Sequence, residues 1–169
     1  MNAKGHMCMA TSCYIFTEQL SPTLPIYNSG AVDWLSGLLI AILGGLIVDL
    51  DHPDSLVGSK LKFLSIPISI IFGHRGMFHS LLAIIGICYL LVEYIEPTLN
   101  ASIQPFLIPF IIGFISHLFA DSLTPAGIYW FYPLKYRVRI AIAKDPLTQF
   151  MIYAPTLVYA VYLKVFELF

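Results

Sequence analysis

Four of the five histidines in this 169-residue chain lie in three short segments that also carry four of its ten acidic residues. The segments are 49–55 (DLDHPDS), 73–80 (GHRGMFHS) and 116–121 (SHLFAD), and the fifth histidine, His6, follows Gly5. Mixed imidazole and carboxylate ligands without cysteine suit Zn²⁺, Mn²⁺ or Fe²⁺, and carboxylate-rich versions suit Mg²⁺. A bound divalent ion lowers the pKa of water and supplies a nucleophile near neutral pH. We therefore expect one or two divalent ions, with Zn²⁺ as the first choice, and hydrolysis as the reaction class.

The spacing of His117 and Asp121 places both side chains on one face of a helix, because residues four apart are neighbours there. Such a pair can bind one ion, or the carboxylate can orient the imidazole of a metal ligand. A histidine at a helix end with an aspartate in solvent is an equally good interpretation of this pair alone.

Asp49, Asp51 and His52 follow an apolar stretch that must break before Pro53. Alternate residues of an extended turn can point the same way, so these groups can converge on a cation. The competing interpretation is a solvated loop that merely ends the stretch.

His74 and His79 flank Arg75 and Gly76. The glycine permits a tight turn into the following helix, and the guanidinium suits two-point contact with a phosphate or carboxylate. Arg75 can also be explained as one of the positive residues that collect on the cytoplasmic side of membrane proteins.

The composition predicts that these groups belong to a membrane protein. Hydrophobic residues make up 58% of the chain and charged residues 11%, with a mean hydropathy of +0.80, whereas soluble domains carry roughly a quarter charged residues. The formal net charge is −1 without a basic tail, which argues against direct nucleic-acid binding. Cys8, Cys13 and Cys88 share no zinc-like spacing and are interpreted as reduced core residues.

Apolar stretches predict an all-α integral membrane bundle of four to five transmembrane helices, forming a single domain over residues 1–169. The stretches run from Met7 to Leu20, Asp33 to Asp49, His79 to Ile95, Pro105 to Asp121 and Leu147 to Phe169. The first is short for a span. A further stretch from Phe63 to Gly73 is too short to cross and is expected to be re-entrant or interfacial.

The basic residues predict the orientation. With a cytoplasmic N-terminus and five crossings, the loops Ser21 to Val32 and Glu96 to Gln104 face outward, and neither contains Lys or Arg. Every Lys and Arg except Lys164 then falls on the cytoplasmic side, as the positive-inside rule requires. All three histidine-bearing segments and His6 lie at the cytoplasmic ends of the stretches, although histidine was not used to choose the orientation.

Several blocks occur in one order over residues 1–133: Gly5-His6, Asp49 to Pro53, Gly73 to Gly76 followed by His79-Ser80, and Ser116-His117 followed by Asp121, Thr124, Pro125 and Gly127. This set resembles the YdjM-like family of bacterial inner-membrane proteins, which are named as metal-dependent hydrolases. One name of the family mentions LexA binding. The chain departs from the pattern at Phe78, where the family usually has Thr, and so lacks a hydroxyl that could hydrogen-bond a ligand or substrate.

The resemblance implies an inner-membrane hydrolase working from the cytoplasmic face. The implied metal ligands are His6, Asp51, His52, His79, His117 and Asp121, with Asp49 as a ligand or a supporting group. His74 is the expected general base or a further ligand, and Arg75 is expected to hold an anionic group. A lipid or a lipid-linked phosphate or ester is the expected substrate, because membrane lipids reach such a site laterally.

Two other function classes stay open. A metal-free lipid phosphatase with a histidine nucleophile would share the spacing of His117 and Asp121, but the preceding blocks of that signature are missing. A membrane scaffold or metal sensor that docks a cytoplasmic regulator agrees with the LexA association in the family name. A transporter is disfavoured, since transporters place polar ligands near the bilayer midplane.

Overall fold

The computed structural model describes residues 2–20 and 32–166, and confirms the all-α class for this part of the chain. Residues 21–31, which include most of the first expected outward loop, lie outside the described part. The main helices are α1 (Ala3–Leu20), α2 (Trp34–Ile47), α3 (Lys62–Phe72), α4 (Leu81–Leu90), α5 (Glu96–Leu99), α6 (Gln104–Ser122) and α7 (Pro146–Phe166). An isolated bridge between Ile128 and Val138 joins parts of the loop before α7.

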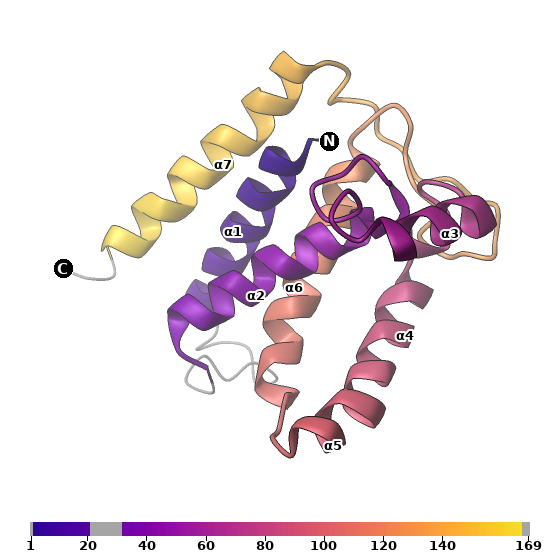
Figure 1. Cartoon of the computed structure of the whole chain (residues 1–169). Coiled ribbons are helices and arrows are strands. Elements are labelled where there is room, and N and C mark those ends of the chain that lie inside the picture. The colour runs from indigo at the N-terminus through magenta and orange to yellow at the C-terminus, as the bar shows by residue number, and fades with distance from the viewer. Residues whose placement is uncertain (1, 21–31, 167–169) are drawn as a thin grey trace.

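Within residues 2–20 and 32–166, four helical segments are long and apolar enough to cross a membrane: Trp34–Asp51, Leu81–Leu99, Gln104–Ser122 and Pro146–Phe166. They correspond to four of the five expected spans. Helix α1 has the length of a span but is not among the four. It instead packs against α2, α6 and α7 and buries much of one face within the bundle (Figure 1).

Helix α3 confirms that the stretch around Pro67 is too short to cross. Its 11 residues extend over about 16 Å, roughly half the hydrocarbon thickness. Phe63, Ile70 and Ile71 are exposed on it, at 72, 78 and 70%. That α3 is a re-entrant or interfacial helix stays a prediction.

The backbones of α2 and α6 approach each other through glycines. A Cβ added to Gly113 would overlap the carbonyl oxygen of Ala41, and one added to Gly44 would overlap the carbonyl oxygen of Phe110. Small residues permit such close contact between membrane helices. Phe114 and Leu118 of α6 are fully buried beside this contact and form the core with Val48 of the first span.

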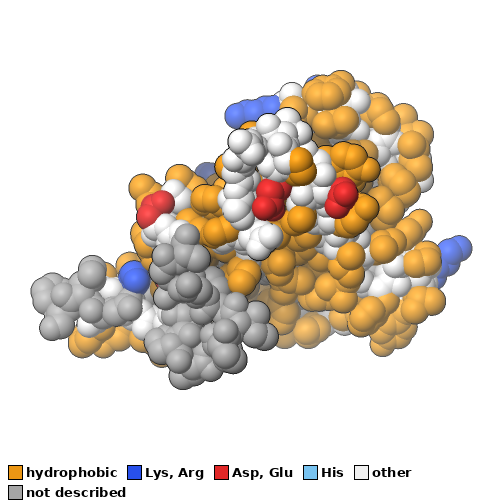
Figure 2. All heavy atoms as spheres, turned by 90° about the horizontal axis from the view of Figure 1, so that it is seen from below, with side chains coloured by type: hydrophobic (Ala, Val, Ile, Leu, Met, Phe, Trp, Pro, Cys, Tyr) orange, Lys and Arg blue, Asp and Glu red, His pale blue; other side chains and the backbone are white. Residues whose placement is uncertain are grey.

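Helix α4 packs on the core through one face near its start, where Ala83 and Ile84 are buried and Ile87 and Cys88 are partly buried. The span then continues through a π-helical turn, η4 (Leu91–Ile95), into α5, leaving most of its surface open. Seen from the α5 end, the molecule is covered mainly by hydrophobic side chains with isolated charges (Figure 2). Such a surface is suited to lipid rather than to water.

Replacement of Gly113 by alanine is predicted to lower the free energy of unfolding by about 1–3 kcal/mol, because the methyl group must push α2 and α6 apart. Thermal denaturation in detergent measures this change. Gly86→Ala is the matched control, since a Cβ at Gly86 meets nothing within 4 Å. Equal melting temperatures for the two variants would contradict the close contact.

Candidate metal centre

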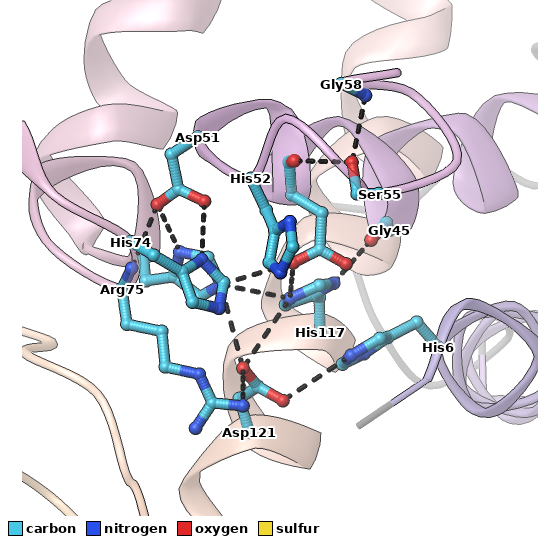
Figure 3. Close-up of polar contacts among 12 residues, drawn as sticks. His6, Gly45, Asp51, His52, Ser55, Gly58, His74, Arg75, His117 and Asp121 are labelled. Atoms are coloured by element: carbon cyan, nitrogen blue, oxygen red, sulfur yellow. Dashed lines mark hydrogen bonds and ion pairs between the residues drawn. The ribbon is translucent and has the colours of Figure 1, made fainter. Parts of the chain in front are cut away.

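The polar groups singled out in the sequence meet at one end of the bundle (Figure 3). They come from four parts of the chain. Helix α1 provides His6, and the 3-10 turn η2 (Val48–Asp51), which prolongs α2, provides Asp49 and Asp51. The loop 73–76 and the turn η3 (Met77–His79) provide His74, Arg75 and His79, and α6 provides His117 and Asp121. Asp51, His79, His117, His6 and Asp121 are at most 1% exposed. Buried polar groups of this kind need partners, because unpaired charge is costly away from water.

His117 is oriented by a backbone carbonyl of the neighbouring helix. Its Nδ1–H donates to the Gly45 carbonyl oxygen at 2.6 Å, across the glycine contact between α2 and α6. A carbonyl can only accept, so Nδ1 carries the proton and Nε2 keeps its lone pair. His117 therefore presents Nε2 to the middle of the cluster.

Asp51 connects three residues of the loop that follows α3. One oxygen, Oδ2, accepts from His79 Nδ1 at 2.9 Å and from the backbone N–H of Arg75 at 3.1 Å. The other, Oδ1, accepts from His74 Nδ1 at 3.0 Å. Both imidazoles are thus held with Nδ1 toward Asp51. The backbone of Arg75 has a φ of +63° here, and the bond to Asp51 helps to hold this left-handed conformation.

Ligand atoms of four side chains lie close to one another. His79 Nε2 and His117 Nε2 are 3.3 Å apart, and Asp49 Oδ1 is 3.6 Å from each of them. Asp121 Oδ2 lies 3.6 Å from His79 Nε2 and 3.9 Å from His117 Nε2. A tetrahedral ion with bonds of 2.0–2.1 Å needs ligand atoms about 3.3–3.4 Å apart. The two nitrogens already have this separation, and small movements bring in the oxygens.

His6 stacks flat on His117, with ring centroids 3.6 Å apart and an angle of 8° between the rings. Its Nε2 is 3.4 Å from Asp121 Oδ1, and neither ring nitrogen has a hydrogen-bond partner within the described residues. Two groups of side chains could hold an ion. The first is fully buried and consists of His6, His117 and Asp121; the second includes the partly buried Asp49 and the exposed His74 together with Asp51 and His79.

His52 and His74 lie at the outer side of the cluster and line a cavity of about 360 Å³ together with Arg75. Their rings meet edge to face, with centroids 4.7 Å apart. His52 is in neither of the two groups above. Its Nδ1 accepts from the backbone N–H of Asp54 at 3.1 Å, which leaves Nε2 to carry the proton of the neutral ring.

Arg75 links the loop to α6. One guanidinium nitrogen lies 3.1 Å from Asp121 Oδ2, and the other donates to the Thr124 hydroxyl at 3.0 Å. The side chain is 18% exposed and also borders the cavity. The guanidinium therefore neutralises part of the carboxylate charge and keeps an edge toward solvent.

His79 is the group on which the carboxylates act most strongly. Burial by itself would lower the pKa of its imidazole, but the interactions with Asp49 and Asp51 outweigh burial and raise the pKa to about 9. Without an ion, the imidazole is therefore positively charged at neutral pH. A metal that binds at Nε2 takes the place of this proton.

The structure brings together all nine residues expected from the sequence, with His52 and His74 outermost. Sequence reasoning missed two contributors. Thr124 was noted without a role, although a hydroxyl three residues beyond Asp121 can be recognised as a capping or anchoring group. Gly45 packs closely against Gly113 and Ala10, and its carbonyl also fixes His117. A backbone carbonyl leaves no signal in a sequence.

Comparison with known proteins agrees with the motifs. The chain matches the family model described as YdjM inner membrane protein over residues 1–167. It is 37% identical over 148 residues to Inner membrane protein YdjM of Escherichia coli (strain K12), covering 84% of this chain and 70% of that protein, and the same holds for Inner membrane protein YdjM of Shigella flexneri. Uncharacterized protein YvsG of Bacillus subtilis (strain 168) is 37% identical over 101 residues, 59% of each chain. No solved structure matches.

Arg75→Ala is predicted to destabilise metal-free protein by about 3 kcal/mol, because it leaves the buried Asp121 carboxylate without its guanidinium. Arg137→Ala is the control, because Arg137 is exposed and contacts the Ala126 carbonyl and the hydroxyl and ring of Tyr129, away from any buried carboxylate of the cluster. Its expected loss is about 1 kcal/mol. Thermal denaturation after metal stripping compares the two variants, and equal losses would show that Arg75 does not support the cluster.

Proposed function

This chain belongs to the family of YdjM inner membrane proteins, and we propose that it is a hydrolase that uses a divalent metal ion held by its His/Asp cluster. The proposal includes a multi-pass topology in which the N-terminus and the cluster face the cytoplasm. That side is supported by Lys and Arg, which collect at the end of the bundle that carries the cluster.

The observation that carries the proposal is the close approach of ligand atoms from four side chains: His79 Nε2, His117 Nε2 and Asp49 Oδ1 lie within 3.6 Å of one another, and Asp121 Oδ2 lies 3.6 and 3.9 Å from the two nitrogens. We assign the metal ligands to His79 Nε2, His117 Nε2, Asp49 Oδ1 and Asp121 Oδ2. Two imidazoles and two carboxylates suit Zn²⁺ first, then Mn²⁺ or Fe²⁺, with Mg²⁺ the poorest match. His6 Nε2 and Asp121 Oδ1 offer ligands for a second ion beside the first.

Asp51 and Gly45 act through the ligands. Each accepts the Nδ1–H of one ligand imidazole, so that Nε2 of His79 and of His117 faces the ion. Carboxylates and backbone carbonyls commonly hold metal-binding histidines in this way and raise their basicity. In this assignment Asp51 is a positioning residue, and Asp49 is the ligand of η2.

The cavity beside the cluster holds groups that can move protons. A divalent ion at the cluster would polarise the scissile group and lower the pKa of the attacking water. His74 has Nδ1 fixed by Asp51 and Nε2 free, as a general base requires. His52 has the opposite arrangement, with the proton on Nε2, and can donate it to the leaving oxygen. Arg75 can hold an anionic substrate oxygen at the rim.

A lipid or a lipid-linked phosphate or ester is the substrate class that this placement favours. The cluster lies at the ends of membrane-spanning helices, so a headgroup at the membrane surface can reach the cavity without leaving the bilayer. Binding of membrane lipid is thus part of the proposed function, and the reaction consumes water and releases the headgroup or the acyl chain.

Purified wild-type protein is predicted to contain one or two equivalents of metal, and a His79→Ala/His117→Ala variant none, because the variant lacks both imidazole ligands. Elemental analysis of detergent-purified protein measures this directly. A wild-type protein that binds no ion after reloading with Zn²⁺ or Mn²⁺ would overturn the proposal. A metal-free phosphatase or a scaffold would then be the better interpretation.

Asp51→Asn is predicted to weaken metal affinity about 10- to 100-fold while leaving the stoichiometry unchanged, because it disturbs the orientation of His79 and removes no ligand. Asp54→Asn is the control, since Asp54 lines the same cavity and its interaction with the site runs through its backbone N–H. Competition with a chromophoric chelator measures both affinities. Loss of a whole equivalent of metal in Asp51→Asn would make Asp51 a ligand instead.

A further inference from the structure

A second hollow lies on the membrane-facing side of α4. It has a volume of about 270 Å³, is almost entirely apolar, and is lined by Met77, Phe78, Leu82, Ala83, Gly86, Ile87 and Leu90. Leu82, Gly86 and Leu90 are spaced by four, so they form one stripe along the helix. We call this hollow the α4 groove.

Gly86 makes the groove. A Cβ added at this glycine would meet nothing within 4 Å, so the position is open rather than filled by a neighbouring helix. Glycine in a helix interior costs about 0.5–1 kcal/mol relative to alanine, and here no close helix contact offsets the cost. Only 11% of the most apolar window in the Leu81–Leu99 span is buried within the chain. The groove therefore faces the lipid phase.

The groove and the polar cavity are joined by one short segment of chain. His74 and Arg75 line the cavity, and Met77 and Phe78, two and three residues later, line the start of the groove. His79, a proposed metal ligand, completes the same turn. From there α4 runs away from the cluster (Figure 1), and its stripe from Leu82 to Leu90 covers about 12 Å.

We propose that the α4 groove binds an acyl chain of the lipid whose headgroup occupies the cavity at the metal cluster. The binding of the headgroup rests on the proposed function, whereas the binding of the acyl chain rests on the groove alone. A molecule with its polar end at His74 and Arg75 would reach the groove past Met77 and Phe78, which follow in the same segment.

The test compares Gly86→Phe, which fills the groove, with Ile85→Phe, which adds the same ring at a neighbouring position that is 66% exposed and outside the groove. Full-length protein in detergent is titrated with dioleoyl phosphatidylglycerol, and bound lipid is counted by native mass spectrometry. Glycerol 1-phosphate serves as a probe with the headgroup phosphate and no chain. Metal content is measured in parallel, to show that the cluster is intact.

Gly86→Phe is expected to weaken lipid binding about tenfold, because the added ring takes the space of the acyl chain in the groove. Ile85→Phe should bind lipid as the wild type does, and all three proteins should bind glycerol 1-phosphate equally. Equal lipid affinity in the two variants would overturn the proposal. So would conversion of a dimer to a monomer by Gly86→Phe at unchanged lipid affinity, because a second copy would then cover the groove.

The two proposals fail separately. If lipid binding responds only to Gly86→Phe but the metal-loaded protein hydrolyses no lipid, the groove stands and the hydrolase assignment falls. If the metal-loaded protein hydrolyses lipid but Gly86→Phe and Ile85→Phe bind lipid with equal affinity, the hydrolase assignment stands and the groove does not bind the acyl chain.

Discussion

The close approach of α2 and α6 is the constraint on which the cluster depends. Gly44 and Gly113 let the two backbones meet without side chains between them. At this spacing, the Gly45 carbonyl reaches His117, and the η2 carboxylates at the end of α2 come within reach of the imidazoles of η3 and α6. A wider separation would leave His117 without its acceptor. It would also separate Asp49 from the two nitrogens that it faces.

Once the helices are close, the arrangement of charge follows from the cost of burial. Asp51 and Asp121 are almost completely buried, and buried carboxylates must be paired or bind a cation. Asp51 is satisfied by two imidazoles and a backbone N–H, and Asp121 by Arg75 together with the histidines. These pairings leave Nε2 of His79 and of His117 facing inward. The need to pair the buried carboxylates therefore also orients the imidazoles that are proposed to bind the metal ion.

The sequence predicted those features for which burial in a membrane makes most residue types energetically too costly. Long apolar runs predicted the four described segments that are long and apolar enough to cross a membrane; α1 is not among them and packs against α2, α6 and α7. Histidines and aspartates near those runs identified the members of the cluster, because such residues are expensive in a membrane. The sequence did not predict which carboxylate faces which imidazole nitrogen, since Asp49 and Asp51 are the same residue type two positions apart. Only coordinates show that Asp51 faces Nδ1 of His79 and that Asp49 faces Nε2.

The stacking of His6 on His117 has a consequence for biosynthesis. His6 is synthesised well before its partner Asp121, which lies 115 positions later in the sequence. At roughly 5–20 residues per second, translation alone separates them by about 6–23 s. Throughout that interval α1 and the η2 carboxylates have no α6 to pack against, so the cluster closes only as the third of the four spans is inserted. Assembly of the centre is therefore a late step of membrane insertion, and α1 must remain close to the growing bundle until α6 arrives.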